Sequence, residues 1–166
     1  MKHLRGVLLA VLFAVLLGTG FAQQTRHLLS SDELSKAVPA EYFFRGQKAP
    51  TQMRNATGFQ LADGKMTLAA LVDSSGYSTA IQQKYLGLLV TESRLKIGGA
   101  ELPPGQYGFG FVADKFVVMN VANDDLLSVG YQNDADLKRP VPLKIAQEAD
   151  GYKLYAGRKW VSVKPE

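Results

Sequence analysis

From Glu41 onward the chain alternates apolar and polar residues with a period of two, and turn-forming residues interrupt the alternation at short intervals. This pattern predicts half-buried β-strands joined by tight turns. The links are too short for the crossover of a dozen or more residues that parallel strands need, so the strands must run antiparallel. The chain is therefore expected to be all-β. The expected strands cover residues 41–47, 58–61, 65–72, 81–97 (bent or broken at Gly87), 106–112, 115–121, 126–131, 141–147, 151–155 and 159–163.

The short links also predict how the strands are arranged. They favour an antiparallel meander, in which each strand pairs with the next, and such a sheet exposes long edges unless it curls shut. We therefore expect an up-and-down β-barrel, with a two-sheet β-sandwich as the alternative. Residues 122–140 are the best place for a longer connection, and the sandwich is correct if this segment crosses between two sheets.

A short helix is expected before the strands. Ser30 and Glu33 have the spacing of a capping box, in which each side chain bonds the other residue's backbone N–H at a helix start. Pro39 disfavours helical geometry at Val38, so the helix should cover residues 31–37. Residues 23–40 are then a lead-in, and residues 41–166 are long enough for one all-β domain.

The first 22 residues have the pattern of a secretory signal peptide. Two basic residues precede the apolar run 6–17, and Gly20 and Ala22 lie three and one positions before a cut at Gln23. The run is shorter than the roughly 20 residues of a membrane-spanning helix. The chain has no cysteine, which excludes disulfides and a lipid-modified cysteine. We expect an exported, soluble protein, periplasmic or extracellular, with no stable membrane anchor after processing.

Charge and composition exclude several classes of function. Signal removal takes two of the 19 basic residues, and the remaining 17 face 15 acidic ones, a net charge near +2. The basic residues are scattered along the sequence and form no continuous stripe, so nucleic acid is not an expected partner. His27 is the one histidine of the mature chain, and no nucleophile-base pair or ligand cluster is visible. We expect no enzyme, no cofactor and no metal, with segments 123–125 and 133–136 forming turns rather than calcium loops.

Residues 106–111 place three aromatic rings on one face of a strand and two glycines on the other. The rings can form core while the glycines let the strand bend, or the bare glycine face lets a ligand or another backbone approach closely. The candidate ligand-binding aromatics are those expected to point inward: Tyr85, Tyr107, Phe109 and Phe111. Trp160 is expected to be a core or rim ring.

A second candidate group comprises Arg45, Gln47 and Arg54, hydrogen-bonding residues without nearby acids. If the chain reverses at Ala49-Pro50, the two arginines converge near one barrel opening and can bind a carboxylate or phosphate. The alternative is a solvated loop whose arginines pair with surface acids.

The segment 97–107, with Leu102-Pro103-Pro104-Gly105 before Tyr107, resembles a hairpin of exported bacterial β-domains, including carboxypeptidase-regulatory-like sandwiches. The mature chain, with segments 43–47 and 154–158, is also similar to uncharacterised small exported all-β proteins of bacteria. The resemblance implies export and an unassigned function, and it supplies no catalytic residues.

Two functions follow from these observations. One is a soluble binding protein whose barrel holds a small apolar or anionic molecule; the other is a structural or protein-interaction module of the cell envelope without a ligand pocket. A cavity of several hundred Å³ lined by the inward aromatics favours the first, and an interior filled by side chains favours the second.

Overall fold

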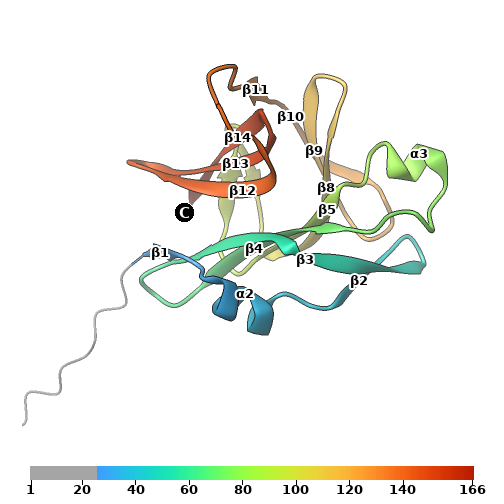
Figure 1. The fold of residues 1–166 in the computed structure, drawn as a ribbon, viewed down its shortest axis with the longest axis horizontal. Coiled ribbons are helices and arrows are strands. Elements are labelled where there is room, and N and C mark those ends of the chain that lie inside the picture. Colours follow the sequence, from blue (N-terminus) through green and yellow to red (C-terminus); the bar gives the residue numbers. More distant parts are fainter. Residues whose placement is uncertain (1–25) are drawn as a thin grey trace, which may run out of the picture.

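The computed structural model describes residues 26–166, so the predicted signal peptide, residues 1–22, lies outside the described residues. Within residues 26–166, a pair of antiparallel sheets face each other and two short helices are present (Figure 1). The first sheet contains β1 (His27–Leu28), β2 (Glu41–Phe44), β3 (Gln47–Gln60), β4 (Met66–Val72), β5 (Gly87–Thr91), β8 (Gly105–Val112), β9 (Lys115–Met119) and β10 (Asp125–Gly130). The second contains β6 (Leu95–Ile97), β7 (Ala100–Leu102), β11 (Gln132–Asn133), β12 (Val141–Glu148), β13 (Gly151–Gly157) and β14 (Lys159–Pro165). The helices are α2 (Ser31–Ala37) and α3 (Thr79–Gln82).

The strand pairing confirms the predicted class and corrects the preferred architecture. The first sheet has the order β1-β3-β4-β5-β8-β9-β10, with β2 on β3, and the second has β12-β13-β14-β6-β7, with β11 on β14. All of these pairs are antiparallel. The all-β antiparallel prediction is therefore confirmed. The two sheets do not close into a barrel, so the preferred barrel is wrong and the sandwich alternative fits.

Three crossings between the sheets explain why the simple meander fails. After β5 the chain enters the second sheet to form the hairpin β6–β7, then returns so that β8 pairs with β5. Leu95, Ile97 and Leu102 of this hairpin are fully buried, so the second sheet holds it by apolar contact. The chain crosses again between β10 and β12, within the segment where the sandwich alternative requires a connection.

Two expected boundaries also differ. The pattern predicts a loop between residues 47 and 58, whereas β3 runs from Gln47 to Gln60 with an irregularity in its pairing between Thr51 and Ala56. The expected strand 81–97 is divided, because α3 takes its first residues and the crossing to the second sheet interrupts it after β5.

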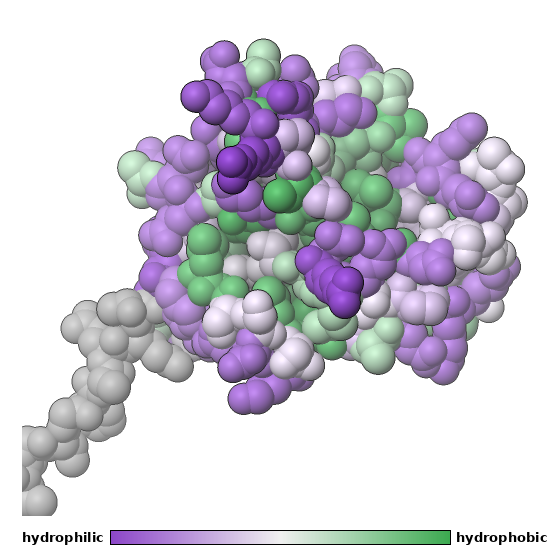
Figure 2. Space-filling view, in the orientation of Figure 1, coloured by the Kyte–Doolittle hydropathy of each residue, from purple (hydrophilic) through white to green (hydrophobic). Residues whose placement is uncertain are grey.

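The main core lies between the two sheets. Phe59 of the first sheet and Tyr152 of the second are both buried and stack with ring centroids 3.7 Å apart. One edge of the second sheet meets the first sheet where the backbone N–H of Ile145 donates to the Thr57 hydroxyl at 3.0 Å. Apolar residues also gather in a hollow between the sheets on the face seen in Figure 2.

The outer face of the first sheet is covered by the chain's own segments. The helix α2 forms where the capping box predicts it and ends before Pro39; its Leu34 packs with Val38 over Leu68 and Ala70. Farther along, the β2–β3 hairpin and the segment that includes α3 cover the sheet with a second apolar cluster, which we call the outer cluster. The central strands β4, β5, β8 and β9 are therefore largely buried on both faces. No helix in the described residues has the length and hydropathy needed to cross a membrane.

Candidate functional site

The aromatic residues of β8 belong to the core between the sheets. Tyr107 and Phe109 are buried and Phe111 is partly buried. The ring of Phe116 lies 5.8 Å from that of Phe109 and 5.0 Å from that of Phe111, centroid to centroid. These three candidate residues therefore pack against other side chains, as the core interpretation of residues 106–111 predicts.

The glycine face of β8 meets another segment of the chain. A Cβ added at Gly108 would lie 2.7 Å from the Phe44 ring, and one added at Gly110 would lie 1.8 Å from the carbonyl oxygen of Lys84. The close approach that bare glycines permit is therefore used by the chain's own backbone and rings.

Tyr85 belongs to the outer cluster on the first sheet, whereas the other candidate aromatics belong to the core between the sheets. Its ring stacks on Phe44 at 4.0 Å and meets Tyr77 edge-on at 5.7 Å. The hydroxyls of Tyr42 and Tyr85 are buried and have no hydrogen-bond partner among the described residues. Burial raises the pKa of Tyr42 to about 12 and also raises the pKa of Tyr85, so both hydroxyls stay protonated at neutral pH.

The candidate arginines lie in different regions of the first sheet. Arg45 occupies the turn between β2 and β3 with a positive φ of 52°. Its backbone N–H donates to the Val121 carbonyl at 2.7 Å, and its guanidinium donates to the Ala122 carbonyl at 3.4 Å. Arg54 lies within β3 and lines a groove of about 290 Å³ beside α2.

The expected reversal at Ala49-Pro50 does not occur, because both residues lie inside β3. The seven steps from Gln47 to Arg54 span roughly 23 Å of extended strand. Gln47 instead supports the outer cluster, since its backbone carbonyl accepts a hydrogen bond from the Tyr77 hydroxyl at 3.0 Å. The structure therefore does not bring Arg45 and Arg54 together as one anion clamp.

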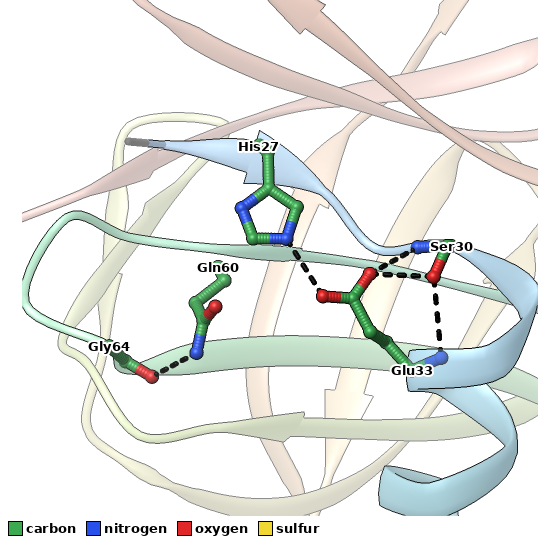
Figure 3. Close-up of polar contacts among 5 residues, drawn as sticks. All are labelled: His27, Ser30, Glu33, Gln60 and Gly64. Carbon is green, nitrogen blue, oxygen red and sulfur yellow. Dashed lines mark hydrogen bonds and ion pairs between the residues drawn. The ribbon is translucent and has the colours of Figure 1, made fainter. Parts of the chain in front are cut away.

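A polar cluster fastens α2 to the edge of the first sheet (Figure 3). One carboxylate oxygen of Glu33 accepts from the backbone N–H and the hydroxyl of Ser30 at 2.8 and 2.7 Å, and the other lies 3.0 Å from Nε2 of His27. The backbone hydrogen bond from Ser30, with side-chain bonds from Ser30 and His27, lowers the pKa of Glu33 to about 2. Glu33 also lines a groove of about 330 Å³ that includes Gln60 and Met66. Both oxygens of this carboxylate thus hold the helix in place.

The outer face of the second sheet differs from that of the first, because its polar side chains surround two aromatic residues, the buried Tyr155 and the partly exposed Trp160. Trp160 of β14 lies opposite Tyr155 of β13, so both rings point to the same side, with their centroids 6.3 Å apart. Lys153 and Ser162 are also paired opposite each other on this face. Trp160 is partly exposed. It is therefore a ring on the outer surface and does not belong to the core between the sheets.

Trp160 contributes to a groove of about 210 Å³ across β13 and β14, which we call the Trp160 groove. The Nζ atom of Lys153 lies 4.4 Å from the indole centroid and 3.2 Å from the Glu148 carboxylate. The Nζ atom of Lys164 lies 3.9 Å from the Asp150 carboxylate. The groove is lined by Glu148, Asp150, Gly151, Tyr152, Lys153, Trp160, Ser162 and Lys164.

The Trp160 groove is not among the sites predicted from the sequence, although a signal is present there. In residues 159–164 the alternation places Trp160 with Ser162 and Lys164, opposite Val161 and Val163. The alternation alone does not tell which face of the strand is covered. Among residues 26–166 no group of three or more His, Cys, Asp or Glu side chains lies close enough to hold a metal ion.

No family model matches the chain, and no match was found among curated proteins or solved structures. The function of this chain is therefore inferred from its own geometry.

Proposed function

We propose that this chain is an exported binding module that holds its ligand in the Trp160 groove, on the outer face of the second sheet. The observation that carries the proposal is a partly exposed indole in a groove of about 210 Å³ on that face. Binding sites commonly combine an aromatic surface with a few convergent polar groups, and this groove has both. On the first sheet the rings of Phe44 and Tyr85 are buried in the cluster that the chain's own segments form. The exposed ring of Phe43 lines none of the four grooves described among residues 26–166.

The packing of the candidate aromatics supports a surface site over an interior one. Phe109 is fully buried and in contact with other core residues, and Tyr85 is stacked in a separate cluster. Each of the four grooves described among residues 26–166 is lined by other residues than Tyr85, Tyr107, Phe109 and Phe111. Rings that already fill space between strands have no free face to offer a ligand.

Export belongs to the proposal, and it predicts a defined product. Expression with the natural N-terminus in a bacterial host should release a protein that begins at Gln23 and carries no lipid. Intact mass of the exported material tests this prediction. A retained Met1 or an acyl adduct would contradict it.

The binding proposal is tested with the exported protein and four probe classes: neutral oligosaccharides, acidic polysaccharides, short peptides and vesicles with anionic lipid. Trp160 is the only tryptophan, so its emission reports on the groove directly. The proposal expects one class to change this emission saturably and to lose affinity in Trp160→Ala. If no class binds in a manner that depends on Trp160, the proposed site is wrong.

A second candidate function keeps the expectation of a small apolar ligand. The observation in its favour is the apolar hollow between the sheets in Figure 2. A fluorescent amphiphilic dye such as anilinonaphthalene sulfonate tests it on the folded protein. Stoichiometric binding that is retained in Trp160→Ala would favour the hollow over the Trp160 groove.

A further inference from the structure

We infer that the ligand of the Trp160 groove is a neutral glycan, whose sugar ring stacks on the indole while its hydroxyls bond the charged side chains around it. This inference rests on the proposed function and adds the chemical class of the ligand. Three properties of the groove support it: its balance of charge, its mixture of hydrogen-bond donors and acceptors, and its size.

The charges of the groove sum to zero. Its lining includes two lysines and two carboxylates, and each lysine lies close to one carboxylate: Lys153 to Glu148 at 3.2 Å, and Lys164 to Asp150 at 3.9 Å. A site for a polyanion needs cations in excess, because binding depends on neutralising the ligand's charges. The balanced charge therefore matches an uncharged ligand.

The same side chains supply both kinds of hydrogen-bonding group. The ammonium groups of Lys153 and Lys164 donate, the carboxylates of Glu148 and Asp150 accept, and the Ser162 hydroxyl does both. A sugar hydroxyl is itself a donor and an acceptor, so neighbouring hydroxyls on one ring are satisfied by such an alternating set. An apolar molecule would exclude water from these charged groups and offer them no hydrogen bond in return.

The indole supplies the remaining contact. Sugar rings carry a face of C–H groups, which packs against the electron-rich face of an aromatic ring. The Lys153 ammonium lies 4.4 Å from the indole centroid. Lys153 also contacts Glu148, so it retains a partner when a sugar ring replaces it on the indole.

The size of the groove favours one ring of a longer chain. Its volume of about 210 Å³ is below the roughly 300–1,000 Å³ of pockets for drug-sized molecules. The groove lies on an open sheet face, so further sugar units can continue across the surface. We therefore expect oligosaccharides to bind more tightly than the single sugar.

The test is a fluorescence titration of the exported protein with neutral hexasaccharides built from glucose, xylose or N-acetylglucosamine. We expect saturable binding to at least one of them, unchanged between about 50 and about 500 mM salt because no net charge is neutralised. Trp160→Ala should weaken that binding by about tenfold or more, measured by calorimetry. Phe43→Ala is the matched control: it removes an exposed ring, 56% accessible, from the first sheet and should leave binding unchanged.

A second variant keeps the test decisive if Trp160→Ala does not fold. Ser162→Val removes the hydroxyl that both donates and accepts, retains the indole, and should also weaken neutral-glycan binding. Binding of polygalacturonate alone, weakened by salt, would overturn the inference and leave the proposed site intact. Failure of all neutral glycans to bind also overturns it, and failure of every probe class overturns the proposed function as well.

Discussion

The close approach of two backbone segments at Gly110 makes a quantitative prediction. A Cβ at this position would lie 1.8 Å from the Lys84 carbonyl oxygen, where ordinary contact begins at 3.4 Å. Gly110→Ala must therefore push the segment before β5 outward by about 1.6 Å. That segment is held against β8 by the hydrogen bond from Leu86 N–H to the Phe109 carbonyl, 2.8 Å long.

Two effects contribute to the expected loss of stability. Local overpacking costs about 1–3 kcal/mol. Displacement of the fully buried Tyr85 from its stack on Phe44 adds a fraction of the roughly 3–5 kcal/mol that loss of a core aromatic costs. We expect about 3 kcal/mol for Gly110→Ala, from urea unfolding followed by far-UV circular dichroism. Gly130→Ala is the matched control, since nothing lies within 4 Å of its added Cβ, and it should change stability by less than about 0.5 kcal/mol. Equal midpoints for the two variants would refute the close approach.

Two further predictions concern the core and the helix α2. Phe109→Ala should destabilise the fold by about 3–5 kcal/mol in the same assay, and a shift below about 1 kcal/mol together with loss of ligand binding would mean that this ring serves binding instead. The folded-state pKa of Glu33, about 2, lies below its ordinary value of 4.5, so its contribution is complete above about pH 5 and is lost as the pH falls toward 2. The stability difference between the wild type and Glu33→Gln should thus shrink as the pH falls from about 5 and vanish near pH 2. A difference that grows between about pH 5 and about pH 2 would contradict the assignment.

The alternation of residues predicts which side of a strand a residue occupies, but not what covers that side. In β8 the period of two separates Phe109 from Gly110, and the structure keeps that separation. The backbone at Lys84 covers Gly110, and this contact depends on how distant segments pack, which local pattern does not encode. The same limit applies to Trp160, whose side of β14 could be predicted and whose exposure could not.

The arginine hypothesis depended on a turn whose position the sequence indicates only weakly. Proline at residue 50 is compatible with a turn and also with a strand position that donates no hydrogen bond. In the structure Glu41 lies opposite Pro50, and the turn falls at Arg45 and Gly46, both with positive φ. Gly46 accepts this geometry without strain, which makes it the stronger turn signal of the two.

The contrast between the two sheets also explains why the binding surface lies where we propose it. The covering segments of the first sheet are the β2–β3 hairpin and the long stretches at residues 29–40 and 73–86. In the second sheet β12, β13 and β14 follow one another through tight turns, and on their outer face the buried Tyr155 donates from its hydroxyl to the Asp134 carboxylate at 3.3 Å. The rest of that face carries lysines and carboxylates, which keep it soluble. Trp160 is the partly accessible ring of that face, and its contact with Tyr155 holds it in place when a sugar ring replaces Lys153 on the indole. A ring positioned before the ligand arrives loses little freedom on binding, which is the property that a stacking surface for a sugar requires.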